Sequence, residues 1–357
     1  MTEIQHVPDD IAEPPPLAAR ALTGRRALLI GGGVALAAGA LGVGLARRAP
    51  ERAYTADGLR KLTLAWNANA ICLAPVLLAK ELGIFRNHGL EVELFNFAGP
   101  TDQMLEALST GKADAGIGMI MRWIKPLEQG FDVRLIAGTH GGCIRMSGSR
   151  AAGVTPDPKS LAGKVIGLSD INGAAFNTFA VLLKYHGLDP KRDVEWRAYP
   201  QPLLGEAIRK GEVQAIADSD PILYKMEQDS RGDLVEVLSN LTKPWDRRVC
   251  CVVGAGGSLL RDDPESARAL ASSLVQAAKL CQGDPEQTAR LFAPYAKASV
   301  EDIAGVLRTQ THGVHPVGTD LIGDIALYAG ELRDIGVMKA DTDPQRFAER
   351  TVQNLFT

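Results

Sequence analysis

The chain has 357 residues, of which 46% are hydrophobic, so it can form one large domain or two medium-sized domains with proper cores. A formal net charge of −3 argues against a nucleic-acid-binding protein, and an aromatic content of 5% leaves few stacking surfaces for bases or sugars. The sequence contains no P-loop, dinucleotide-binding fingerprint or Ser-His-Asp order. We therefore predict a protein without a cofactor and without catalysis.

The N-terminal residues 1–48 are predicted to be an export segment. An uncharged apolar run at 27–46 lies between Arg25-Arg26 and Arg47-Arg48, and the stretch TGRRALL resembles a twin-arginine export signal. The rest of the chain is then expected in the periplasm. The alternative is an uncleaved membrane anchor, because an apolar run of this length is just long enough to span a bilayer.

From residue 60 onward, short apolar strands alternate with amphipathic helices. The pattern predicts strands at 61–66, 91–97 and 113–119, with helices at 73–85 and 101–111 between them. Strands that alternate with helices of this length are typical of parallel βαβ units. The predicted fold class is therefore α/β.

An internal duplication organises the sequence. The word HGL at His88 recurs at His186, and a helix that ends on Gly111 is matched by one that ends on Gly211. Because both pairs are separated by nearly the same number of residues, they indicate a true internal repeat, which predicts two similar lobes. The alternative is coincidence, since helix–glycine–strand junctions are common in α/β folds.

The duplication also predicts where the lobes begin and end. Lobe one is expected to comprise residues 60–142 and 252–357, and lobe two residues 147–246. The chain would cross between them near 138–146 and 247–256, and these crossings would act as hinges. The mostly helical residues 264–357 would pack outside the lobes and complete lobe one.

Three stretches carry a family resemblance over about residues 60–350: LAPVLLAKELGIFRNHGLEVELFNF…ALSTGKADAGI, SLAGKVIGLSD and AIRKGEVQAIADSDP. In this order they resemble the nitrate/sulfonate/taurine class of ABC-transporter substrate-binding proteins. The resemblance implies a two-lobed type II periplasmic-binding-protein-like fold, a monomer that closes over a small-molecule ligand, and docking on an ABC permease with its ATPase subunits. It implies no nucleic acid, and a membrane contact only through an uncleaved N-terminal segment.

The ligand is expected where strands end and helices begin, because open α/β sheets bind ligands there. Helix N-termini at this edge would suit a small anionic ligand, such as a sulfonate or nitrate. For each residue the alternative role is ordinary helix capping. The predicted ligand-binding residues are Asn67, Asn69, Cys72, Thr101, His140, Cys143, Asn172, Ala174, Asp218, Asp220, Cys250 and Cys251.

Four of the five cysteines fall at predicted cleft or crossing positions, and His140 precedes Cys143 by three residues in HGGC. Thiolates with one imidazole predict a site for a thiophilic metal, formed by Cys72, His140, Cys143 and Cys251. Of the adjacent pair, at most one of Cys250 and Cys251 is expected to face the cleft. The alternatives are a Cys72–Cys143 disulfide or inert core cysteines, as is expected for Cys281.

HGGC…VCCVV further resembles a subset of this class for thiophilic or organometallic ligands. The alternative function is that of a thiamine-pyrimidine-precursor synthase-like enzyme, because such synthases share the fold and use cysteines, a histidine and iron. The export segment argues against it. His312 and His315 have metal-like spacing, but we expect them in a surface loop.

Overall fold

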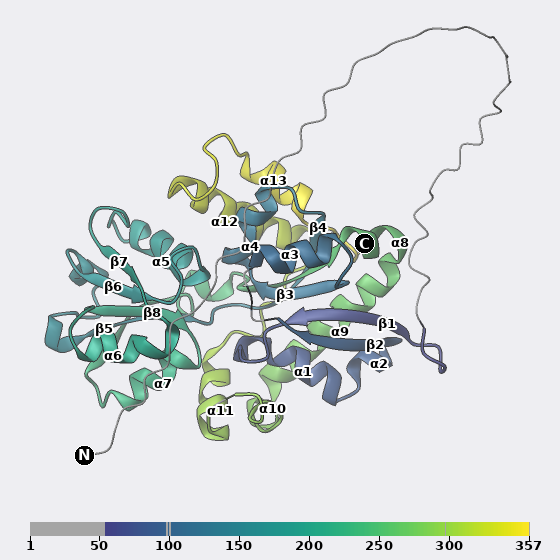
Figure 1. The fold of residues 1–357 in the computed structure, drawn as a ribbon, viewed down its shortest axis with the longest axis horizontal. Helices are drawn as coiled ribbons and strands as arrows, with labels where there is room; N and C mark the ends of the chain where they lie inside the picture. Colours follow the sequence, from purple (N-terminus) through teal and green to yellow (C-terminus); the bar gives the residue numbers. More distant parts are fainter. Residues whose placement is uncertain (1–53, 98, 100, 297, 357) are drawn as a thin grey trace, which may run out of the picture. The chain divides into compact units, whose positions relative to one another are not determined.

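The computed structural model describes residues 54–356 apart from 98, 100 and 297 (Figure 1). The predicted export segment at 1–48 lies outside these residues. Within the described part of the chain, no helix combines the length and the apolar character needed to cross a membrane.

The first β-sheet has the strand order β2-β1-β3-β10-β4. β1 pairs in parallel with β2 and β3, as predicted, whereas β10 is antiparallel to β3 and β4. Its strands are β1 (Arg60–Trp66), β2 (Leu90–Asn96), β3 (Ala115–Met119), β4 (Val133–His140) and β10 (Cys251–Gly256). The three predicted strands are thus confirmed.

The second sheet repeats this plan with the order β7-β6-β8-β5-β9. β6 pairs in parallel with β7 and β8, and β5 is antiparallel to β8 and β9. Its strands are β5 (Ile144–Ser149), β6 (Val165–Leu168), β7 (Glu195–Ala198), β8 (Ala215–Ser219) and β9 (Leu234–Ser239). In each sheet the antiparallel strand follows a connection from the other sheet.

The glycines of the sequence repeat occupy equivalent turns. Gly89 and Gly187 have φ of 77° and 83°, and Gly111 and Gly211 have φ of 72° and 74°. Only glycine adopts this left-handed conformation without a steric cost, so it ends a helix and lets the chain turn into the next strand. The repeated words therefore mark the same helix-to-strand turns in both sheets.

Thirteen α-helices cover the sheets in the described residues, and α1 and α3 lie on opposite sides of the first sheet in Figure 1. Gly83, in the left-handed region, splits the predicted helix at 73–85 into two. The helices are α1 (Ala74–Glu81), α2 (Ile84–Asn87), α3 (Thr101–Ser109), α4 (Ile120–Glu128), α5 (Ala174–Tyr185), α6 (Leu204–Arg209), α7 (Ile222–Asp229), α8 (Gly257–Asp262), α9 (Pro264–Gly283), α10 (Pro285–Phe292), α11 (Val300–Thr309), α12 (Gly318–Asp334) and α13 (Pro344–Thr351).

The C-terminal helices begin at capping side chains that the sequence provides. Asp263, Asp284, Ser299 and Asp343 each accept a hydrogen bond from the backbone N–H three residues ahead, at the starts of α9, α10, α11 and α13. α9 packs on α1 and β4, and so adds to the first sheet's layer. The expectation of a helical C-terminal part is confirmed.

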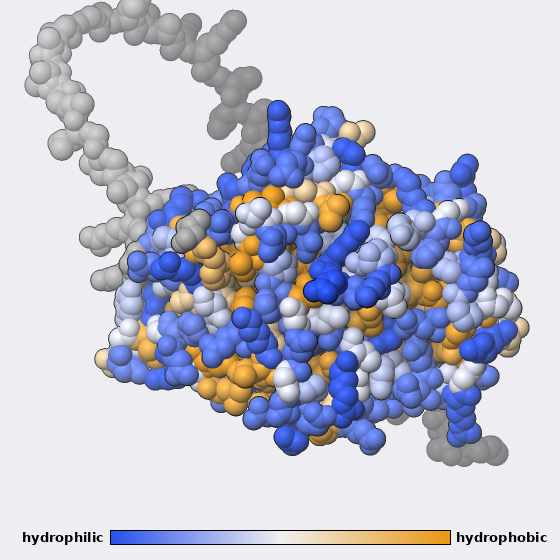
Figure 2. All heavy atoms as spheres, turned by 180° about the vertical axis from the view of Figure 1, so that it is seen from behind, coloured by the Kyte–Doolittle hydropathy of each residue, from blue (hydrophilic) through white to orange (hydrophobic). Residues whose placement is uncertain are grey.

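The chain passes between the two sheets twice. Residues 141–143 connect β4 to β5, and residues 240–250 connect β9 to β10. One large hydrophobic cluster contains buried side chains of both sheets, and a smaller one lies under α6 and α7. Hydrophilic residues cover most of the face seen in Figure 2, with hydrophobic ones in scattered patches. The apolar side chains are thus mainly internal, and both connections run next to them.

Candidate functional site

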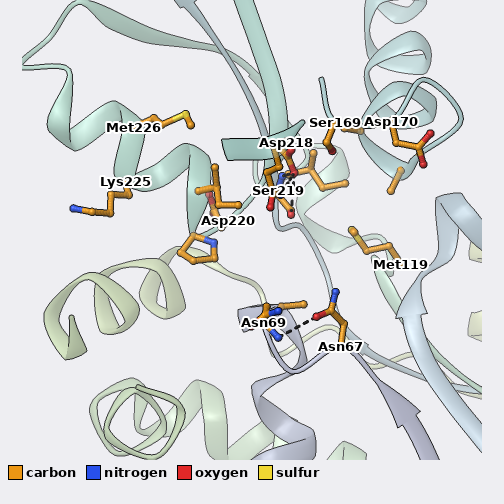
Figure 3. Close-up of a pocket in the computed structure, with 18 of the residues that line it drawn as sticks. Asn67, Asn69, Met119, Ser169, Asp170, Asp218, Ser219, Asp220, Lys225 and Met226 are labelled. Carbon is orange, nitrogen blue, oxygen red and sulfur yellow. Dashed lines mark hydrogen bonds between the residues drawn. The ribbon is translucent and has the colours of Figure 1, made fainter. Parts of the chain in front are cut away.

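A cavity of about 570 Å³ is lined by residues from both sheets (Figure 3). Many of its lining residues lie at or just after the carboxyl ends of β1, β3, β6, β7 and β8. This is the edge of an open α/β sheet at which ligands bind. The cavity is therefore the candidate ligand site.

The first sheet contributes two asparagines, a methionine and an arginine. Asn67 follows β1, and its Oδ1 accepts a hydrogen bond of 3.0 Å from the backbone N–H of Asn69. Met119 ends β3, and Arg122 lies in the first turn of α4. The Asn67–Asn69 bond is drawn in Figure 3 and fixes the turn in front of the cavity.

The N-terminus of α5 opens onto the cavity. Its N-cap is Gly173, which offers no side-chain hydrogen bond, and Ala174 and Ala175 of its first turn line the cavity. Backbone N–H groups at a helix start carry a partial positive charge and have no partner within the helix. This end of the cavity therefore suits an anionic group.

Asp218 carries an unsatisfied hydrogen-bond acceptor in the lining of the cavity. It is the next-to-last residue of β8 and is 5% exposed. Its Oδ1 accepts hydrogen bonds from the Ser219 backbone N–H at 2.7 Å and from Gln201 Nε2 at 3.2 Å. Its buried Oδ2 has no hydrogen-bond partner among the described residues. A buried carboxylate oxygen without a partner is unfavourable, so a donor from the ligand would satisfy it.

Asp220 is also buried but has a partner. Both of its carboxylate oxygens accept from Arg145 Nε, at 3.1 and 3.0 Å, and Arg145 also pairs with Glu236. Burial raises the pKa of Asp220 to about 6, because desolvation outweighs the attraction to Arg145. The nearby carboxylates raise the pKa of Arg145 against the opposing effect of its own burial, so the guanidinium stays charged.

One ion pair spans the cavity. Arg122, from the first sheet's side, lies with Nη2 3.5 Å from Oδ2 of Asp170, which follows β6 in the second sheet. The Nε of Arg122 is buried without a hydrogen-bond partner in the described structure. Arg122 therefore retains one buried donor without a partner while it links the two sides.

Five of the predicted ligand-binding residues line the cavity: Asn67, Asn69, Ala174, Asp218 and Asp220. Asn172 is exposed in the turn before α5, where its backbone N–H donates to Asp170 Oδ1 at 2.9 Å. Thr101 is the first residue of α3 and does not belong to the lining.

Other lining residues were not among the predicted ligand-binding residues. Ser169 and Asp170 directly follow β6 and Ser219 ends β8, so position at a strand end was a usable signal for them. Arg122 and Lys225 are inside helices, and their sequence neighbourhood gives no such signal.

Four of the cysteines and His140 form a buried group separate from the cavity lining. Cys72, His140, Cys143, Cys250 and Cys251 are each at most 3% exposed, and none belongs to the lining residues described here. Cys143 Sγ lies 3.4 Å from Cys250 Sγ, and Cys251 Sγ lies 3.8 Å from Cys72 Sγ. The structure holds all five cysteines as free thiols, so it contains no Cys72–Cys143 disulfide.

Contacts among the four thiols and their burial shift their pKa values in opposite directions. Contact with Cys143 lowers the pKa of both Cys72 and Cys250 well below the usual thiol value. Contact with Cys250 raises the pKa of Cys143, and burial raises that of Cys251. The pKa is thus lowered for two of the four thiols and raised for the other two. Cys281 lies apart in α9, where burial raises its pKa to about 12.

The expectation of a surface position for His312 is wrong. This side chain is completely buried, and its ring centroid lies 5.3 Å from that of His140. Burial lowers the pKa of His312 to about 3, so it is neutral. The sequence showed no companion ligand, because residues 140 and 312 meet only through the tertiary fold. His315 is half-buried.

Two sheets of matching order, two connections and a cavity at the strand ends define an α/β, two-lobed periplasmic-binding-protein-like fold of type II. Solved structures share it: the aliphatic sulphonate binding protein SsuA from Escherichia coli (17% identity, TM-score 0.67, 82% of this chain and 92% of that one) and the nitrate-binding protein NrtA from Synechocystis PCC 6803 (14%, TM-score 0.66, 83% and 86%). The chain belongs to the NMT1-like family, whose model matches residues 55–296.

Two proteins with similar sequences have different functions. The nitrate import ATP-binding protein NrtC from Synechococcus elongatus is 26% identical over 238 residues, which are 61% of this chain and 35% of that protein. The 4-amino-5-hydroxymethyl-2-methylpyrimidine phosphate synthase THI11 from Saccharomyces cerevisiae is 29% identical over 121 residues, or 33% and 34%. The chain thus spans about a third of the length of these relatives. The predicted resemblance to the nitrate and sulfonate binding proteins is confirmed.

Proposed function

We propose that this protein is the extracytoplasmic solute-binding component of an ABC importer and that it binds a small molecule in the cavity between its two sheets. Family membership and the fold shared with sulfonate-binding and nitrate-binding proteins support this function. The protein carries out no chemistry on its ligand. Its partners are the importer's permease and ATPase subunits, and it works in the periplasm as a monomer.

The cavity's two ends favour a ligand with two different polar groups. The uncapped start of α5, near Arg122, suits an anionic group such as a sulfonate or carboxylate. The unpaired Oδ2 of Asp218 suits a hydrogen-bond donor, such as an ammonium or amino group. We therefore propose a small solute that carries both, and the unpaired buried oxygen of Asp218 is the observation that carries this choice.

Closure of the two lobes on the ligand would be the state that the permease recognises. A ligand that contacts residues of both sides favours the arrangement in which both sides reach it. Asn67 and Asn69 on one side and Asp218 on the other are positioned for such contacts. Arg122 and Asp170 already join the two sides by an ion pair that a bound ligand would reorganise.

A ligand panel tests this function. We expect isothermal titration to show one binding site per chain for an aminoalkanesulfonate, weaker binding of the matching alkanesulfonate without the amino group, and weaker binding still of nitrate. Equal affinity for the first two would contradict the role of Asp218. No binding of any small anion, with or without an amino group, would sink the proposal.

A thiophilic ligand in the cavity has less support. Among the described lining residues, sulfur comes only from the thioethers of Met119 and Met226. Thioethers alone bind soft metals less strongly than thiolates do. We therefore include an organometallic compound in the ligand panel. If it binds more tightly than the aminoalkanesulfonate, a thiophilic ligand would be favoured.

The second candidate function is enzymatic. It is favoured by the similarity to the yeast pyrimidine phosphate synthases and by the fold shared with the desulfurization enzyme DSZB (15% identity, TM-score 0.55, 81% of this chain and 98% of that one). The two functions differ in what is recovered after incubation. Mass spectrometry of the bound fraction should return an unchanged ligand from a binding protein and an altered one from an enzyme.

A further inference from the structure

We propose that the buried thiols and imidazoles at the two connections between the sheets form a resident metal site for a single thiophilic d¹⁰ cation, Zn²⁺ or Cu(I). The six residues come from four separate segments: Cys72 after β1, His140 and Cys143 at the first connection, Cys250 and Cys251 at the second, and His312 before α12. This site is independent of the solute cavity.

The donor atoms are close enough for one ion. Ligand atoms of Cys72, His140 and Cys251 all lie within 4.8 Å of one another. Cys143, whose side chain contacts both Cys72 and Cys251 and whose Sγ lies 3.4 Å from that of Cys250, would supply the fourth ligand. Two or three thiolates with one imidazole are a donor set that soft cations prefer, and that tetrahedral Zn²⁺ accepts.

Core packing alone does not account for these side chains. Neither ring nitrogen of His312 has a hydrogen-bond partner in the described part of the chain, and those of His140 make no well-aligned hydrogen bond and only contact the Cys72 side chain and the Gly141 backbone, although both rings are fully buried. Buried imidazole nitrogens normally have partners, and an orphaned pair calls for an explanation such as an ion. A cation bound to His140 would use one of these nitrogens directly.

The surroundings hold the donors in place as a supporting shell does around a metal. Asn240 Oδ1 accepts from the backbone N–H groups of Cys143 and Ile144, at 2.8 and 2.9 Å, and its Nδ2 lies 3.6 Å from Cys250 Sγ. The backbone N–H of Cys250 donates to the carbonyl of His140 at 2.8 Å. Such hydrogen bonds orient ligands before the metal arrives.

The same packing explains the two glycines of HGGC. A Cβ on Gly141 would lie 2.1 Å from Thr311 Oγ1, and one on Gly142 would lie 2.1 Å from the backbone oxygen of Asn240. Only glycine lets the first connection approach the second connection and the 311 loop this closely. The glycines thus bring His140 and Cys143 against the other donors.

The location of the site means that the cation would stay bound whether or not the cavity holds a solute. The six side chains are buried and do not line the cavity described above, so solute exchange would leave the ion in place. The ion would tie both connections to the turn after β1. It would therefore fasten the segments about which the two lobes must move.

The test uses the full chain, isolated without oxygen and stripped of metal with a chelator. We expect competition titrations to show tight binding of one equivalent of Zn²⁺, measured against a chromophoric zinc chelator, or of Cu(I), measured against a copper(I) chelator. The two titrations distinguish the two cations. Co²⁺ in place of Zn²⁺ should give the thiolate charge-transfer bands of a tetrahedral site.

Variants identify the ligands. Cys72→Ser and Cys251→Ser should each weaken binding at least about 100-fold, in line with loss of a ligand rather than of its supporting shell. Cys281→Ser is the matched control, since this equally buried thiol lies in α9 and should leave affinity unchanged. Circular dichroism checks that each variant folds, and His140→Gln provides a second, non-cysteine variant with the same expected loss.

Three results would overturn the proposal. They are no stoichiometric binding of either cation by the wild-type protein, undiminished binding by the folded Cys72→Ser or His140→Gln variant, and a Cys143–Cys250 disulfide in protein isolated without oxygen. None of these outcomes depends on solute binding in the cavity. The metal site and the proposed transport function can therefore fail separately.

Discussion

The cavity and the thiol cluster lie close together along the chain but differ in almost every physical property. Ala70 and Ile144 line the cavity, whereas Cys72 and Cys143, two residues and one residue away, do not belong to its lining. The cavity groups include carboxylates, amides and a helix start within reach of water, while the cluster gathers sulfur and imidazole away from it. A solvent-accessible polar site suits a ligand that exchanges, and a buried soft site suits one that stays.

The largest effect is expected from crowding the cluster. Gly142→Ala places a methyl group against the backbone of Asn240, so the connections must separate. We expect a loss of about 3 kcal/mol or more in unfolding free energy, measured by urea denaturation. Gly323→Ala in α12 is the matched control, because its Cβ would meet no atom within 4 Å and a helical alanine is favourable. Equal stability of the two variants would contradict this close packing.

The next largest effect concerns the cavity alone. Asp218→Asn removes the charge that a ligand donor would meet, and a hydrogen bond to a charged group contributes about 1.5–3 kcal/mol. Solute affinity in isothermal titration should therefore fall roughly 10–100-fold. Asp229→Asn, at an exposed lining residue, is the control and should change affinity little. If metal binding by the cluster fell together with solute binding, the two sites would not be independent.

A smaller effect should follow pH through Asp220. Its pKa of about 6 in the folded protein lies above the ordinary value of 3.8, so between these values the folded state holds the proton more tightly. Stability should therefore fall as pH rises through this window, by at most about 1.4 kcal/mol per pH unit. The difference in unfolding free energy between wild type and Asp220→Asn, followed from pH 4 to about pH 7, isolates this contribution. A difference that grows more favourable to wild type with rising pH would refute it.

The smallest effect is expected at the ion pair across the cavity. Asp170→Asn breaks the 3.5 Å contact with Arg122, whose side chain is 34% exposed, with 46% for Asp170. Exposed pairs contribute about 0–1 kcal/mol, so the melting temperature should hardly change. A loss several times larger would mean that this pair, and not the buried connections, holds the two sides together.

Much of the fold could be predicted from the sequence because local sequence patterns specify it. Alternating apolar residues in 61–66 and the glycines at 89, 111, 187 and 211 specify strands and helix ends through backbone geometry that needs no distant partner. The repeat of these turns predicted two similar units. Strand ends then predicted Asn67, Asp218 and Asp220, which the structure places in one cavity lining.

The tertiary structure alone decided which side chains meet and which of them water can reach. At most one of the adjacent cysteines was expected to face the cleft; neither lines the cavity, and Cys250 contacts Cys143 while Cys251 contacts Cys72, so both belong to one cluster. His312 joins His140 across a sequence distance that no local pattern spans. Local sequence determines backbone conformation, but burial and contact depend on how distant segments pack, and this packing separated an open cavity from a closed thiol site.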